Sequence, residues 1–109
     1  MVNSTDEKRS GPRKPMHGIG EIVDPNSGGT FPVKLLDISS AGISMLSQVA
    51  RTEGSLLILR FEVDGQQLRG VIRIAYCVKH SLTDAYRLGA EFRDWETQYL
   101  EIVQNILDA

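Results

Sequence analysis

Short apolar runs separated by turn-forming residues extend over most of this chain. In the second run, Phe31, Val33 and Leu35 recur at the period of two that is typical of a β-strand. Such runs predict six strands, at residues 17–23, 31–38, 43–46, 56–63, 67–78 and 86–92. The fourth and fifth strands are joined by Asp64-Gly65, a pair that favours the type I′ turn of a β-hairpin.

The spacing of apolar residues changes near the C-terminus. Four of them follow the i, i+3, i+4, i+7 pattern of an amphipathic helix, namely Tyr99, Ile102, Val103 and Ile106. This spacing predicts a helix at about residues 95–107, with Asp94 as its N-cap and Trp95 as its packed anchor. Together the elements predict an all-β fold with a C-terminal helix, in the form of a six-stranded antiparallel β-barrel.

The N-terminal segment, residues 1–15, contains almost no apolar side chains. Gly11, Pro12 and Pro15 disfavour a helix, and the segment carries four basic and two acidic residues. We therefore expect 1–15 to be a flexible basic arm, followed by a barrel domain at 16–109. The positive charge of the arm contrasts with the acidic remainder of the chain, since the net charge of the whole is −2.

Composition and charge narrow the functional classes. A chain of 109 residues fits a single domain, and its negative net charge argues against a general nucleic-acid-binding protein. The single cysteine, Cys77, excludes an internal disulfide and a multi-cysteine zinc site, and it fits a reducing cytosol. Because the apolar runs are too short for a membrane span and the N-terminus lacks a signal-peptide pattern, we expect a cytoplasmic location without membrane insertion.

The sequence contains no pattern that predicts an enzyme. Neither a Ser/His/Asp arrangement, nor a metal-ligand cluster, nor a glycine-rich phosphate loop is found. We therefore expect no catalytic residues, no metal and no cofactor other than a bound ligand.

The first candidate binding motif is Arg9-Ser10-Gly11-Pro12-Arg13. In an extended segment its two guanidinium groups share one face and lie up to ~13 Å apart, at roughly 3.3 Å per residue. Each can bind a phosphate, or the O6/N7 edge of guanine, through two parallel hydrogen bonds. Considered alone, the motif is more simply interpreted as a solvated basic tail.

The second candidate motif is Asp37-Ile38-Ser39-Ser40-Ala41-Gly42. Alternation puts Asp37 and Ser39 on one face, and Ile38 in the core. A carboxylate accepts hydrogen bonds only, so Asp37 matches the N1–H and N2–H₂ donors of guanine, while Ser39 can donate to a phosphate or position Asp37. Gly42 permits a positive φ or a close backbone approach. The alternative is a polar turn whose side chains bind the local backbone.

The two motifs together resemble the signature of the PilZ domain family. Arg-x-x-x-Arg is followed 24 residues later by Asp-x-Ser-x-x-Gly, and the strand at 86–92 looks like the closing strand of that family. The resemblance implies a PilZ-like barrel that binds the bacterial second messenger cyclic di-GMP, with the arm ordering around the ligand. It implies ligand contacts from Arg9, Arg13, Asp37, Ser39 and Gly42.

Four further residues are weaker candidates for the same site: Lys8, Ser40, Arg73 and Arg87. In the family, a basic residue at the position of Lys8 is associated with the binding of two ligand molecules, although arginine is the usual residue there. Arg73 and Tyr76 are more simply interpreted as ordinary outward-facing strand residues.

The resemblance implies a cyclic di-GMP receptor or adaptor that takes part in signal transduction through an effector protein. The alternative is a PilZ-like protein–protein adaptor with little or no nucleotide binding. A barrel for single-stranded nucleic acid is disfavoured by the acidic body and by the aromatic content of 6%.

Overall fold

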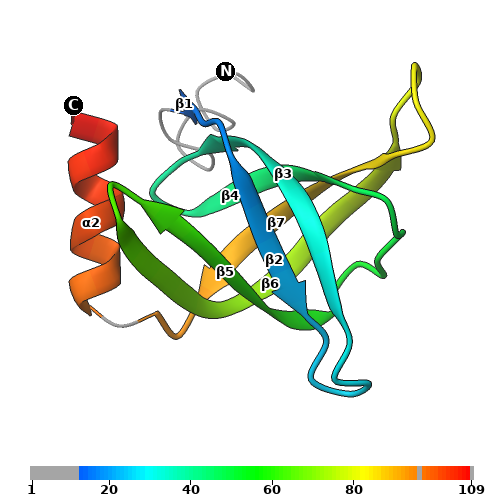
Figure 1. The fold of residues 1–109 in the computed structure, drawn as a ribbon, viewed down its shortest axis with the longest axis horizontal. Helices are drawn as coiled ribbons and strands as arrows, with labels where there is room; N and C mark the ends of the chain where they lie inside the picture. Colours follow the sequence, from blue (N-terminus) through cyan, green and yellow to red (C-terminus); the bar gives the residue numbers. More distant parts are fainter. Residues whose placement is uncertain (1–12, 96, 109) are drawn as a thin grey trace, which may run out of the picture.

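The computed structural model describes residues 13–95 and 97–108 of the chain. These residues form a β-barrel with one helix beside it (Figure 1). The elements are β1 (Lys14–Pro15), β2 (Ile19–Val23), β3 (Thr30–Ile38), β4 (Gly42–Ser47), β5 (Leu56–Val63), β6 (Gln66–Lys79), β7 (Tyr86–Arg93) and α2 (Thr97–Asp108).

Six of the strands close into an antiparallel barrel. The order of neighbours is β3, β2, β5, β6, β7 and β4, and β4 pairs in turn with β3. All six pairings are antiparallel. Closure leaves none of these six strands without a neighbour on either side, which protects the backbone from pairing with other chains. The predicted fold class is therefore confirmed.

The seventh strand, β1, differs from the prediction. Lys14 pairs with Ile38 and Pro15 with Asp37, so the last two residues of the predicted arm lie along β3. The Met16 amide extends this contact by donating to the Leu36 carbonyl at 2.8 Å. The proline is tolerated because β1 lies at the edge of the sheet, where a strand can lack one backbone donor. The remainder of the predicted arm, residues 1–12, lies outside the described residues.

Local backbone geometry agrees with the turn chemistry of the β5–β6 hairpin. Asp64 and Gly65 have φ values of 49° and 80°, and a type I′ turn requires positive φ at both positions. The first strand of the barrel begins two residues later than predicted, at Ile19. The reason is Gly18, whose φ of 123° interrupts the extended backbone.

The core fills the inside of the barrel with alternate residues from each strand. In β5, for example, Leu57, Leu59 and Phe61 point inward and are at most 4% exposed. The buried apolar cluster also includes Ile22, Val33, Leu35, Ile38, Ile43, Met45, Leu68, Ile72, Ile74, Leu88, Ala90, Trp95 and Val103.

Helix α2 packs beside the β5–β6 hairpin (Figure 1), and Val103 enters the core. The helix begins at Thr97, and Asp94 has a φ of 52° three residues earlier, so the prediction of Asp94 as N-cap is wrong. Trp95 precedes the helix but is buried as predicted, and its Nε1 donates to the Val71 carbonyl at 2.6 Å. In the part of the chain that the structure describes, no helix combines the length and apolar character of a membrane span.

Candidate ligand-binding site

The second motif lies on the outer face of the barrel, where four neighbouring strands contribute to one row of residues. Asp37 on β3 is opposite Ser44 on β4, Ser44 is opposite Gly89 on β7, and Gly89 is opposite Tyr76 on β6. Directly opposed residues share a face, and neighbouring strands are about 4.8 Å apart. The barrel thus brings residues that are far apart in the sequence into one surface site.

Two β-bulges set which side chains reach this face. In β3 the register shifts between Leu35 and Asp37, and in β6 it shifts between Ile74 and Tyr76. Leu35 and Ile74 point into the core, so uninterrupted alternation would also turn Asp37 and Tyr76 inward. The extra residue in each bulge reverses the phase, and both side chains therefore point outward.

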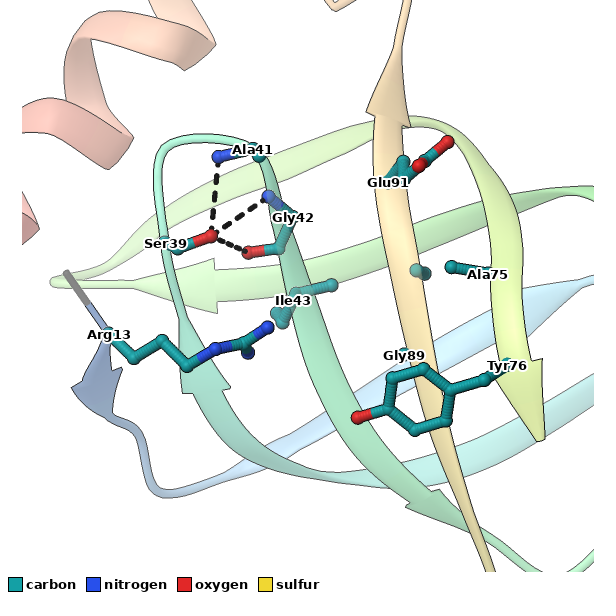
Figure 2. Close-up of a pocket in the computed structure, with 10 residues that line it drawn as sticks. Arg13, Ser39, Ala41, Gly42, Ile43, Ala75, Tyr76, Gly89 and Glu91 are labelled. Carbon is teal, nitrogen blue, oxygen red and sulfur yellow. Dashed lines mark hydrogen bonds between the residues drawn. The ribbon is translucent and has the colours of Figure 1, made fainter. Parts of the chain in front are cut away.

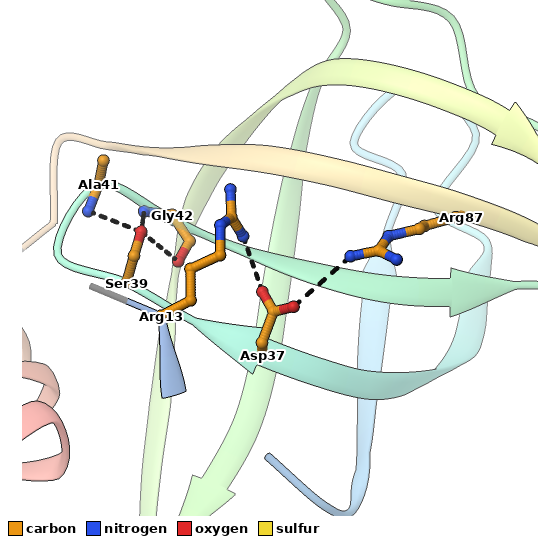
Figure 3. Close-up of polar contacts among 6 residues, drawn as sticks. All are labelled: Arg13, Asp37, Ser39, Ala41, Gly42 and Arg87. Carbon is orange, nitrogen blue, oxygen red and sulfur yellow. Dashed lines mark hydrogen bonds and ion pairs between the residues drawn. The ribbon is translucent and has the colours of Figure 1, made fainter. Parts of the chain in front are cut away.

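Asp37 is held by two arginines from different parts of the chain (Figure 3). Arg13 Nη1 lies 2.7 Å from Asp37 Oδ1, and Arg87 Nη2 lies 3.5 Å from Asp37 Oδ2. Strand β1 explains the first contact, since its pairing with β3 fixes the backbone directly after Arg13. The structure therefore brings together one arginine of the first motif and the aspartate of the second.

Ser39 uses its hydroxyl group within the turn that follows β3. Its Oγ accepts hydrogen bonds from the amides of Ala41 and Gly42, both at 3.3 Å, and lies 3.4 Å from the Gly42 carbonyl (Figure 2). The side chain is buried, at 2% exposure. These contacts match the local-turn alternative for Ser39, and a direct contact between Ser39 and a ligand stays a prediction.

Gly42 is required by a close backbone approach. A Cβ atom at this position would lie 2.0 Å from the carbonyl oxygen of Ala90 on β7. Its φ does not lie in the positive region, so the close approach, rather than unusual backbone geometry, explains the glycine.

A pocket of about 480 Å³ opens between this turn and strand β6 (Figure 2). Its volume is in the range of roughly 300–1,000 Å³ that is common for small-molecule sites. The pocket is lined by Arg13, Ser39, Ala41, Gly42, Ile43, Ala75, Tyr76, Gly89, Ala90 and Glu91.

Tyr76 contributes an aromatic ring to the pocket. The ring lies against the backbone of Gly89, where a Cβ atom would be 2.1 Å from a ring carbon. Tyr76 thus faces outward, as the simpler interpretation has it, and it also lines the pocket. A contact between Tyr76 and a ligand stays a prediction. In the sequence, the glycine at position 89 is the feature that could have indicated space for a ring on this strand. Its pairing with Tyr76, however, exists only in the folded sheet.

The remaining candidates occupy different positions. Arg73 does not line the pocket but reaches its rim, where Arg73 Nη1 lies 3.4 Å from Glu91 Oε1. Ser40 is exposed on the turn and borders a neighbouring hollow that also contains Glu91. Lys8 and Arg9 lie outside the described residues. Within residues 13–95 and 97–108, no cluster of three or more His, Cys, Asp or Glu residues could hold a metal ion.

No protein-family model matches the sequence, and no curated protein matches it. Several solved structures are similar in fold. The motility inhibitor MotI/DgrA of Bacillus subtilis aligns with a TM-score of 0.75 and 12% identity, over 88% of this chain and 47% of that protein. The PilZ domain of CeSA from a cellulose-synthesizing bacterium aligns with a TM-score of 0.67 and 15% identity, over 89% of this chain and 95% of that domain.

The structure of K. pneumoniae MrkH in complex with c-di-GMP aligns with a TM-score of 0.75 and 14% identity. The alignment covers 88% of this chain and 49% of MrkH, so this chain spans about half the length of MotI/DgrA and of MrkH. At these identities the similarity establishes the fold.

Proposed function

We propose that this chain, which has the fold of a PilZ domain, is a non-catalytic receptor for cyclic di-GMP that signals through an effector protein in the bacterial cytoplasm. The observation that carries the proposal is the 2.7 Å contact between Arg13 and Asp37 at the edge of the pocket. These residues belong to the two motifs for which the sequence predicts recognition of phosphate and guanine. A protein of the same fold, MrkH, is known in complex with c-di-GMP.

The proposed contacts follow from the chemistry of the ligand. Cyclic di-GMP carries two phosphodiester anions and two guanines, which suit the guanidinium groups of Arg9 and Arg13. Asp37 would accept hydrogen bonds from the Watson–Crick edge of one guanine. The ring of Tyr76 would stack on a base, since base–aromatic stacking contributes about 1–3 kcal/mol per base.

The turn and the weaker candidates complete the proposed site. Ser39 and Gly42 would shape the turn against which the ligand lies, and Ser40 would stand at its exposed side. Lys8 would add positive charge next to Arg9. Arg73, through its ion pair with Glu91, would lie at the rim of the pocket.

The first prediction concerns selectivity. The protein should bind cyclic di-GMP more tightly than GTP, GMP or cyclic di-AMP, by about tenfold or more for cyclic di-AMP. Adenine lacks the N1–H and N2–H₂ donors, and would leave the Asp37 carboxylate without its partner. Calorimetric titration with each nucleotide gives affinity and stoichiometry together. Equal affinities for the two cyclic dinucleotides would refute the proposed recognition, and no binding at all would favour the protein–protein adaptor.

The second prediction concerns the proposed arm. Residues 8–12 should gain protection from amide hydrogen exchange when cyclic di-GMP binds, because ligand phosphates would offset the cost of ordering a segment with little apolar surface. The Met16 amide should change less, since it donates to the Leu36 carbonyl of β3 without ligand. Exchange measured on the full chain, free and saturated, tests this. Protection of 8–12 that is the same in both states would exclude ligand-driven ordering.

A further inference from the structure

The ion pair between Asp37 and Arg87 spans a strand. Asp37 lies on β3 and Arg87 on β7, and β4 lies between these two strands. The two side chains therefore meet above the outer face of β4, as Figure 3 shows. Ser44, which lies on β4 directly opposite Asp37, is completely buried. A contact that crosses a strand holds the Asp37 carboxylate from the side opposite to Arg13.

The two arginines differ in how firmly their backbones are fixed. Arg87 lies within β7, where it pairs with Leu46 on one side and with Val78 on the other. Arg13 lies just before the two-residue strand β1, and its side chain is 43% exposed. Arg13 can therefore leave Asp37 for another partner more easily than Arg87 can.

In the proposed function, ligand binding takes one of the two arginines away from the Asp37 carboxylate. In the proposed complex with cyclic di-GMP, the Arg13 guanidinium moves toward a phosphate of the ligand. A neutral guanine edge then lies next to Asp37 Oδ1. The Asp37 side chain is only 19% exposed, and a poorly solvated carboxylate without a cation is unfavourable. A second cation that stays in place would prevent this loss.

We propose that Arg87 is a positioning residue that keeps Asp37 Oδ2 occupied, so that Oδ1 becomes available to guanine when Arg13 turns to the ligand. This inference rests on the proposed function and assigns a role within the same site. It differs from a direct contact between Arg87 and the ligand, because here Arg87 acts only through Asp37. The two roles predict different coupling between Arg87 and Asp37.

A double-mutant cycle separates them. Arg87→Ala should weaken cyclic di-GMP binding by about tenfold, which is the effect of losing one charge-assisted contact. In an Asp37→Ala background, Arg87→Ala should cause less than about twofold further loss, since the carboxylate through which Arg87 acts is gone. Arg87→Lys should restore part of the affinity, and Arg87→Ala should also reduce the preference for cyclic di-GMP over cyclic di-AMP.

The matched control is Arg60→Ala. Arg60 is also an ion-paired arginine, its side chain is 41% exposed against 46% for Arg87, and its partner Glu21 lies away from the pocket. The control should leave affinity unchanged, and circular dichroism should show that all variants are folded.

Each result decides a separate question. Additive losses from Arg87→Ala and Asp37→Ala would overturn the positioning role in favour of direct ligand contact. Unchanged affinity in Arg87→Ala would overturn any role in binding. A wild-type protein that does not bind cyclic di-GMP would overturn the proposed function itself, together with the inference that depends on it.

Discussion

Replacing Arg13 with alanine should weaken cyclic di-GMP binding by about tenfold or more and leave the fold intact. Arg13 lines the pocket, and it is the arginine of the first motif that lies within the part of the chain that the structure describes. A guanidinium group that binds a phosphate through two hydrogen bonds contributes more than a neutral contact of the same length. Arg9→Ala should have an effect of similar size, since both arginines are proposed to bind the same ligand.

The fold should tolerate Arg13→Ala because the residue is exposed and its partner keeps a second cation. Exposed ion pairs contribute about 0–1 kcal/mol to stability, and Asp37 retains Arg87 at 3.5 Å. Calorimetric titration measures the affinity, and thermal unfolding of both variants measures the fold. Arg60→Ala again serves as the control for loss of an ion-paired arginine. Wild-type affinity in a folded Arg13→Ala protein would exclude Arg13 from the site.

The largest effect on stability is expected for Trp95→Ala, at about 3–5 kcal/mol of unfolding free energy. The indole is 8% exposed, and its ring centroid lies 4.7 Å from that of Phe92 and 6.1 Å from that of Phe61. It rests on Gly70, where a Cβ atom would approach it to 2.4 Å. Removing it leaves a cavity beneath α2 and a Val71 carbonyl without its donor.

Denaturant unfolding should be followed by far-UV circular dichroism, because Trp95 is the only tryptophan of the chain and the variant loses its fluorescence. A small domain is stable by about 5–15 kcal/mol, so this loss removes a large fraction of the total. Leu100→Ala, on the adjacent helix α2 and 40% exposed, should cost far less and is the control. A loss below about 1 kcal/mol for Trp95→Ala would contradict the anchoring role.

Local sequence patterns predicted most of the fold. The strand at 56–63 is correct at both ends, and the Asp64-Gly65 turn has the expected backbone geometry, because alternation and turn chemistry act over a few residues. The C-terminal helix was also predicted, but its start was not. Asp94 has the side chain of an N-cap, yet its positive φ belongs to the turn that brings Trp95 over the barrel.

The sequence by itself determined the strands, the hairpin, the helix and the two motifs, since each depends on residues that are close along the chain. The tertiary structure alone decided that Asp37 meets Arg87 across β4 and that Tyr76 lies on Gly89. Both contacts depend on strand register between distant segments and on two bulges that reverse the side-chain phase. Alternation within one strand cannot specify that register, because it is set only when the barrel closes and buries one face of every strand.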